Sequence, residues 1–159
     1  MSEEFSPVPG CGICAAIEKI RAGKNPDFVA ELPRSYVVLA WQQFYRGYCI
    51  LFAKRHVTEL YLMPREESRA LFDEVVAVSE AIAAVTEPWK MNYACLGNTE
   101  PHVHWHLTPR YESDPRRYDA IWSRPDVERN VSLADSDRRA LLAALRSEIT
   151  TRLKDARVS

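Results

Sequence analysis

The sequence predicts an α+β domain built on an antiparallel five-stranded sheet, with a long helix and a C-terminal helix. Short runs rich in aromatic and β-branched residues, separated by turn residues, indicate the strands. After the third run, apolar residues recur every three or four positions, which is the spacing of one helix face. A similar pattern closes the chain. Strands and helices in this order favour an α+β arrangement over a parallel sheet.

The first third of the chain is expected to hold an arm, a short helix and three strands. Residues 1–10 contain two prolines and a glycine, which predicts a flexible arm. A helix is expected over residues 15–21, because Gly23 and Pro26 follow it as stop signals. The three strands are predicted at residues 28–32, 36–41 and 48–53.

The remaining elements follow from one long stripe and two further strands. Pro64 suits the first turn of a helix. The stripe behind it consists of Leu71, Val75, Val78, Ile82 and Val85. Strands are then predicted at residues 91–96 and 102–108, and a final helix at residues 133–153. Residues 109–131 are polar and irregular, and a connection of that length is a candidate for function.

Composition limits the kind of partner that the chain can bind. Its 159 residues suit one domain, and a net charge of −1 offers no basic surface for a nucleic acid polymer or a membrane. We therefore expect a small-molecule substrate. No apolar run approaches the roughly 18 residues that span a membrane, and the acidic N-terminus does not resemble a signal peptide. A cytoplasmic location is expected, where the four cysteines would stay reduced.

Three of the four histidines lie two residues apart in the predicted strand at residues 102–108. Because side chains alternate along a strand, His102, His104 and His106 would share one face. The opposite face would carry Val103, Trp105 and Leu107 and seal the strand onto the core. Imidazoles change protonation near neutral pH, so neighbouring ones can act as nucleophile and proton donor. The alternative is that all three bind one catalytic metal.

Residues 102–110, His-Val-His-Trp-His-Leu-Thr-Pro-Arg, resemble the signature of the histidine triad superfamily. Residues 46–51 are similar to its glycine-turn strand, residues 54–57 to the basic pair and histidine that follow, and Asn92 with residues 97–99 to its polar loop. The resemblance covers residues 11–112, which we predict to be the histidine triad domain. Residues 113–159 would add an irregular segment and a helix packed on the same domain. Thr108 departs from the signature, which prefers an apolar residue there.

The resemblance implies a nucleotide hydrolase or transferase. The middle histidine, His104, would attack the α-phosphorus of a dinucleoside polyphosphate or nucleoside phosphoramidate and form a nucleotidyl-histidine, which water then cleaves. His106 would stabilise charge or donate a proton, and His102 completes the catalytic candidates. The phosphate would be bound by Gly97, Asn98 and Thr99. Gln42 lies near the position where relatives place a ribose-binding asparagine. Neither an organic cofactor nor a catalytic metal is expected.

A structural zinc site is also predicted. Cys11 and Cys14 have the two-residue gap that lets two thiolates bind one ion. Zinc-carrying relatives use such a pair together with the histidine after the basic pair and the first triad histidine. The resemblance therefore implies the ligands Cys11, Cys14, His56 and His102. The alternative is two reduced thiols on a loop, with His56 capping a turn.

Three further expectations concern turnover, assembly and the segment after the triad. The chain could be a zinc-stabilised nucleotide-binding protein without turnover. The resemblance implies a homodimer, with the helix after Pro64 and the nearby Trp89 and Met91 as the contact region. Residues 118–122 could form an aromatic lid over the nucleotide, or Trp122 could pack against the sheet.

Overall fold

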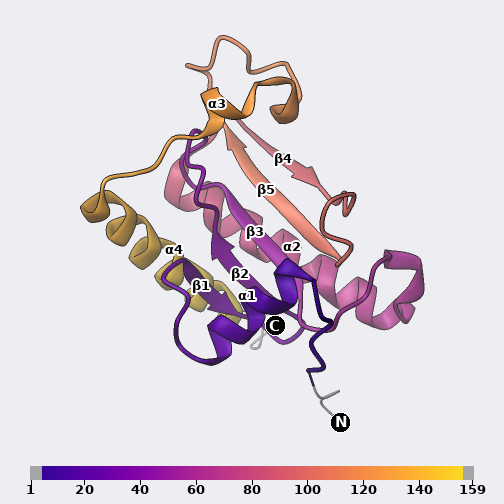
Figure 1. The fold of residues 1–159 in the computed structure, drawn as a ribbon. Helices are drawn as coiled ribbons and strands as arrows, with labels where there is room; N and C mark the ends of the chain where they lie inside the picture. Colours follow the sequence, from indigo (N-terminus) through magenta and orange to yellow (C-terminus); the bar gives the residue numbers. More distant parts are fainter. Residues whose placement is uncertain (1–4, 156–159) are drawn as a thin grey trace.

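A computed structural model describes residues 5–155, so the first four residues of the predicted arm lie outside the described part (Figure 1). Residues 5–10 form neither a helix nor a strand. The elements in chain order are α1 (Gly12–Arg21), β1 (Phe28–Glu31), β2 (Ser35–Leu39), β3 (Cys49–Ala53), η1 (Leu60–Leu62), α2 (Arg65–Thr86), β4 (Lys90–Ala94), β5 (His104–Arg110), η2 (Ile121–Ser123), α3 (Asp126–Arg129) and α4 (Asp135–Asp155). No helix in this part of the chain is long and apolar enough to cross a membrane.

The five strands form one antiparallel sheet in the order β1-β2-β3-β5-β4. Helices α2 and α4 pack on one face of the sheet, and α1 lies on the other (Figure 1). The predicted fold class is therefore confirmed. The predicted elements are all present, with ends that differ by a few residues.

The main core lies between the sheet and helices α2 and α4. The inner faces of the central strands contribute Val37, Leu51 and Leu107, which are fully buried. The apolar stripe of α2 meets them through Leu71, Val75, Val78 and Ile82. Burying each of these side chains contributes on the order of 2 kcal/mol, which explains why helix spacing and strand alternation predict this packing well.

The opposite face of the sheet carries a smaller core and the histidines. Tyr36 and Phe52 pack there against α1. His104 and His106 of β5 pair with Phe52 and Ile50 of β3, so their side chains lie on this same face. The sheet thus separates the main core from the candidate site.

Two predicted elements begin at different residues in the structure. Helix α1 begins at Gly12 because Cys11 caps it, its sulfur accepting a hydrogen bond from the Cys14 N–H over 3.4 Å. The cysteine pair therefore lies at a helix N-terminus and not on a loop. The prediction that His102 lies within the strand is wrong. Its N–H donates to the Glu100 carbonyl in a turn, and β5 begins at His104 and continues to Arg110.

Arg110 organises the irregular segment that follows β5. Its side chain is buried, and its Nη1 donates to Asn92 Oδ1 over 2.9 Å and to the Asp119 carbonyl over 2.7 Å. Its Nη2 donates to Asp114 and to the Arg116 carbonyl. Arg110 is therefore not an exposed side chain at the end of the strand. These four bonds engage both terminal nitrogens of the guanidinium within the protein.

Candidate functional site

His104 and His106 form a hydrogen-bonded pair on β5. Their Nε2 atoms lie 3.1 Å apart, and the rings meet edge to face with centroids separated by 4.9 Å. His104 Nδ1 lies 2.6 Å from the backbone carbonyl oxygen of His102. A carbonyl only accepts, so this contact places the His104 proton on Nδ1 and leaves Nε2 with a lone pair.

Tyr48 holds the second histidine of the pair. Its hydroxyl lies 2.5 Å from His106 Nδ1. Burial raises the pKa of Tyr48 to about 12, so the phenol keeps its proton at neutral pH and donates it to Nδ1. Burial, aided by the neighbouring His104, lowers the pKa of His106 to about 4, so this imidazole is neutral with its proton on Nε2.

The two rings are therefore held in complementary states. The Nε2 of His104 offers a lone pair, and the Nε2 of His106 offers a proton directly beside it. A nucleophile and a proton donor within hydrogen-bond distance form the arrangement that covalent catalysis by a neutral imidazole requires.

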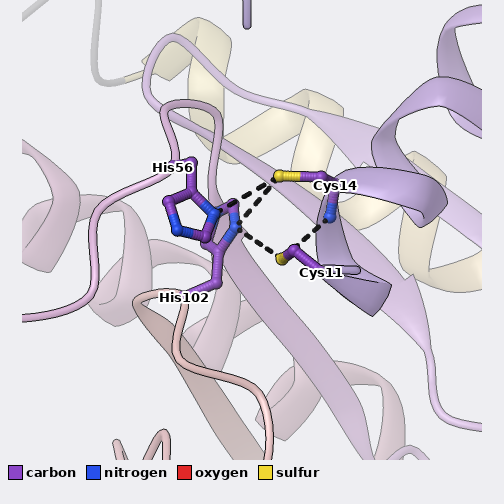
Figure 2. Close-up of side chains that lie close together, drawn as sticks. All are labelled: Cys11, Cys14, His56 and His102. Atoms are coloured by element: carbon purple, nitrogen blue, oxygen red, sulfur yellow. Dashed lines mark hydrogen bonds between the residues drawn. The ribbon is translucent and has the colours of Figure 1, made fainter. Parts of the chain in front are cut away.

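Cys11, Cys14, His56 and His102 form a second cluster at the N-terminus of α1 (Figure 2). The sulfur of Cys14 lies 3.4 Å from His56 Nδ1 and 3.7 Å from His102 Nδ1. The sulfur of Cys11 lies 3.6 Å from His102 Nδ1. In Figure 2 both rings turn these nitrogens toward the two sulfurs.

The geometry of this cluster suits a metal ion. All four ligand atoms lie within 4.8 Å of one another. Around a tetrahedral zinc, with bonds of about 2.3 Å to sulfur and about 2.0 Å to nitrogen, the ligand atoms are about 3.5 Å apart. The sulfur–nitrogen distances of 3.4 to 3.7 Å agree with that spacing. The cluster could therefore hold a metal ion in an S₂N₂ site.

His102 connects this cluster to the histidine pair. Its Nε2 lies 2.8 Å from the Ala53 carbonyl oxygen, so the ring carries its proton there and presents an unprotonated Nδ1 to the sulfurs. Burial lowers the pKa of His102 to about 4, which also keeps the ring neutral. The ring belongs to the cysteine cluster, while the carbonyl of the same residue accepts the hydrogen bond from His104.

The predicted phosphate and ribose residues are only partly brought to the pair. Gly97 borders a cavity that His104 also lines. Asn98 and Thr99 are exposed in the loop between β4 and β5. Gln42 lines a different small cavity together with Tyr48 and without any of the three histidines.

Sequence reasoning did not identify Tyr48 or Gln43. The amide of Gln43 donates to the Tyr48 carbonyl and accepts from the Gly47 N–H, and this builds the turn that delivers Tyr48. Strand alternation contains the signal for Tyr48, because it lies two residues before Ile50, the partner of His106. No comparable sequence signal points to Gln43.

A sheet with paired histidines on its fifth strand defines the histidine triad class of fold. The chain belongs to this family, since the family model described as HIT domain matches residues 22–113. Proteins of this superfamily are in general nucleotide hydrolases and transferases, and some members are not catalytic. A comparison with curated protein sequences gave no significant match.

Several solved structures have the same fold. A histidine triad protein from Marinobacter aquaeolei is 26% identical, with a TM-score of 0.69 over 84% of this chain and 94% of that one. One from Bradyrhizobium japonicum is also 26% identical, with a TM-score of 0.62 over 81% and 94% of the chains. A family protein from Mycobacterium smegmatis, described as zinc-bound, is 21% identical, with a TM-score of 0.65 over 92% and 97%.

Proposed function

We propose that the chain is a hydrolase of nucleotidyl conjugates, either dinucleoside polyphosphates or nucleoside phosphoramidates, and that His104 is its nucleophile. The observation that carries this proposal is the complementary protonation of His104 and His106. His104 Nε2 attacks the α-phosphorus, and the bond to the displaced group breaks. Dividing one difficult hydrolysis into two displacements lowers the barrier of each step.

His106 would serve the displaced group. Its Nε2–H lies beside the attacking nitrogen and can donate to the atom that leaves the phosphorus. The negative charge of a bound phosphate favours a protonated imidazole, so substrate binding raises the pKa of His106 and lets the ring hold the proton that it then donates. Water then attacks the phosphorus and the phosphorus–nitrogen bond to His104 breaks, which releases a nucleoside monophosphate and restores the free histidine.

We also propose that Cys11, Cys14, His56 and His102 hold a structural zinc ion. The sulfur–nitrogen spacing supports a tetrahedral ion, and the zinc-bound protein from Mycobacterium smegmatis has the same fold. Zinc at such a closed site stabilises the fold and takes no part in the reaction. Among the described residues, no cluster of candidate metal ligands includes His104 or His106, which argues against the triad as a catalytic metal site.

A homodimer is a further proposal, supported by an apolar strip on α2 and β4. β4 is an edge strand of the sheet, and its Tyr93 is exposed. Phe72 and Val76 of α2 are also exposed, and Phe72 contacts Trp105 with ring centroids 6.0 Å apart. Light scattering coupled to size-exclusion chromatography tests this proposal, because Phe72→Asp should convert a dimer into a monomer.

The decisive experiment is product analysis with wild type and His104→Ala. Each protein is incubated with diadenosine tetraphosphate and with an adenosine phosphoramidate, and AMP is measured by chromatography. AMP from the wild type alone, with both proteins folded by circular dichroism, supports the nucleotidyl-histidine route. Binding of both compounds without AMP would identify a nucleotide-binding protein, and equal AMP from both proteins would exclude His104 as nucleophile.

A further inference from the structure

A pocket of about 290 Å³ opens beside His106, and the reaction proposed above gives it no role. It is bordered by strand β4, by His106 and Thr108 of β5, and by residues 120–122 of the segment after β5. We call it the β4 pocket. A different cavity, of about 240 Å³, borders His104 and Gly97 but not His106. The two histidines therefore face different spaces.

This division matches the two sides of the proposed reaction. The histidine that bonds to phosphorus borders the cavity with Gly97, the residue predicted to approach the phosphate. The histidine that donates the proton borders the β4 pocket. A proton donor must reach the atom that leaves, so the displaced group lies on the side of His106.

The walls of the β4 pocket suit a flat aromatic group. Trp122 is 41% exposed and meets the His106 ring edge to face, with centroids 5.2 Å apart. Its neighbour Ile121 is buried against Tyr45 and Tyr48, which holds this wall in place. Aromatic rings gain from stacked and edge-to-face contacts beyond the area that they bury.

The short distance between Trp122 and His106 limits how far an aromatic ring bound in the β4 pocket can lie from the atom that leaves the phosphorus. A ring against Trp122 lies within a few bonds of the departing atom, because Trp122 touches the proton donor itself. The base of a displaced nucleotide is separated from that atom by at least a phosphate and a sugar. An amine with a ring on a short linker has the required length.

We propose that the β4 pocket binds the displaced group of the substrate and selects amines that carry an aromatic ring, so that nucleoside phosphoramidates of arylalkylamines are the preferred substrates. This inference rests on the hydrolase function proposed above. His104 Nε2 forms a bond to phosphorus while the phosphorus–nitrogen bond of the substrate breaks, and the amine keeps the electron pair. The amine nitrogen takes the Nε2 proton of the protonated His106, the form that the bound phosphate favours, and His106 becomes neutral. Water later supplies hydroxide to the phosphorus, and its remaining proton restores His106.

Thr108 gives the same pocket a polar group. Its side chain is buried, and its hydroxyl has no hydrogen-bond partner among the described residues. An unpaired buried hydroxyl is unfavourable, so a ligand nitrogen that reaches it gains a hydrogen bond. This accounts for threonine at a signature position that prefers an apolar residue.

The test compares two adenosine phosphoramidates that differ by one ring, those of phenethylamine and of ethylamine. Wild type should show a kcat/KM about tenfold higher for phenethylamine, the size of one aromatic stacking contact. Trp122→Ala should abolish that ratio. Trp89→Ala is the matched control, because Trp89 is similarly exposed, contacts Tyr118 and does not border the pocket. Thr108→Val should lower kcat/KM for both amines.

Each other outcome argues against the inference in a distinguishable way. Turnover of both compounds with equal kcat/KM, or an unchanged ratio in Trp122→Ala, overturns the aromatic pocket and leaves the hydrolase intact. Diadenosine tetraphosphate is the third substrate. If Trp122→Ala impairs it and spares phenethylamine, the pocket binds the base of a displaced nucleotide instead. If no compound yields AMP, the hydrolase proposal fails and this inference fails with it.

Discussion

The backbone carbonyl of His102 accepts a hydrogen bond from His104 Nδ1 over 2.6 Å, while the His102 ring faces the sulfurs of Cys11 and Cys14. One residue thus joins the candidate metal cluster to the candidate nucleophile. An ion that orients the His102 ring would also orient its carbonyl, and through it the His104 ring. The cluster would then contribute to the geometry of the pair as well as to stability.

Metal removal should therefore affect two separate properties. Purified protein is expected to contain one zinc per chain, measured by elemental analysis, and a strong chelator should lower the Tm by roughly 5–10 °C, which is equivalent to a few kcal/mol. The His104 Nδ1–H resonance should also shift or broaden in NMR spectra. Cys14→Ser should lose the metal, whereas Cys95→Ser, outside the cluster, should keep it. Full zinc loss with an unchanged Tm would contradict a structural role.

Tyr48→Phe should reduce catalysis with little change in the fold. The variant removes the donor to His106 Nδ1, so the proton of this ring is no longer held on Nε2 beside His104. Losing a partner that orients a functional histidine typically costs about 10- to 100-fold in activity. We expect that loss in kcat, with KM nearly unchanged, and a change of His106 tautomer in nitrogen NMR.

Tyr36→Phe is the matched control for this variant. Tyr36 is a buried tyrosine on the same face of the sheet, where it packs against Phe52 and does not contact the histidines. It should keep full kcat. Equal loss in both variants would indicate a general packing effect and would remove Tyr48 from the site.

The sequence predicts the parts of this structure that depend on periodic burial. The stripe of α2 and the alternation of β5 follow from spacing alone, and both place apolar side chains on the main core. The turn of His102 toward the cysteines does not follow from spacing, because strict alternation keeps it beside His104; only the resemblance to zinc-carrying relatives predicted it. The burial of Arg110 cannot be predicted from the sequence either. Its partners Asp114, Arg116 and Asp119 lie in an irregular segment, where no periodic pattern indicates which side chains are buried.

Glu74 should make stability depend on pH. It is buried on α2, where its carboxylate accepts hydrogen bonds from the Arg34 N–H over 2.8 Å and the Ser35 hydroxyl over 2.6 Å. Burial raises the pKa of Glu74 and outweighs these bonds, which lower it. The folded state therefore holds this proton more tightly than the unfolded state. The stability that protonated Glu74 contributes is fully present below about pH 4.3, the pKa of glutamate in the unfolded chain. It is lost as the pH rises through the higher pKa of Glu74 in the folded state.

The measurement is urea unfolding of wild type and Glu74→Gln from pH 4 to pH 7. The free energy of unfolding of wild type, relative to the variant, should fall as the pH rises. Glu66→Gln, an exposed position in the first turn of the same helix, controls for the loss of a charge. A difference that grows with pH would mean that the two hydrogen bonds outweigh burial.

Gly47→Ala should destabilise the turn that leads into Tyr48, for two separable reasons. Gly47 has φ of +92°, which a residue with a Cβ adopts at a cost of about 1–2 kcal/mol, and an added Cβ would lie 2.6 Å from Thr86 Cγ2. Gly23 also has a positive φ, of +67°, but nothing lies within 4 Å of an added Cβ. Gly23→Ala should therefore cost only the backbone term, and Gly47→Ala should cost more.

Thr86→Ser separates the two contributions at Gly47, because serine lacks Cγ2 and keeps the hydroxyl that donates to the Ile82 carbonyl. In a double-mutant cycle measured by urea unfolding, Thr86→Ser should recover the excess cost of Gly47→Ala over Gly23→Ala, and no more. No coupling between the two positions would mean that backbone conformation alone requires glycine. Full recovery of the double variant to wild-type stability would mean that the left-handed backbone at residue 47 costs nothing. The contact with Thr86 Cγ2 would then be the whole reason for glycine at this position.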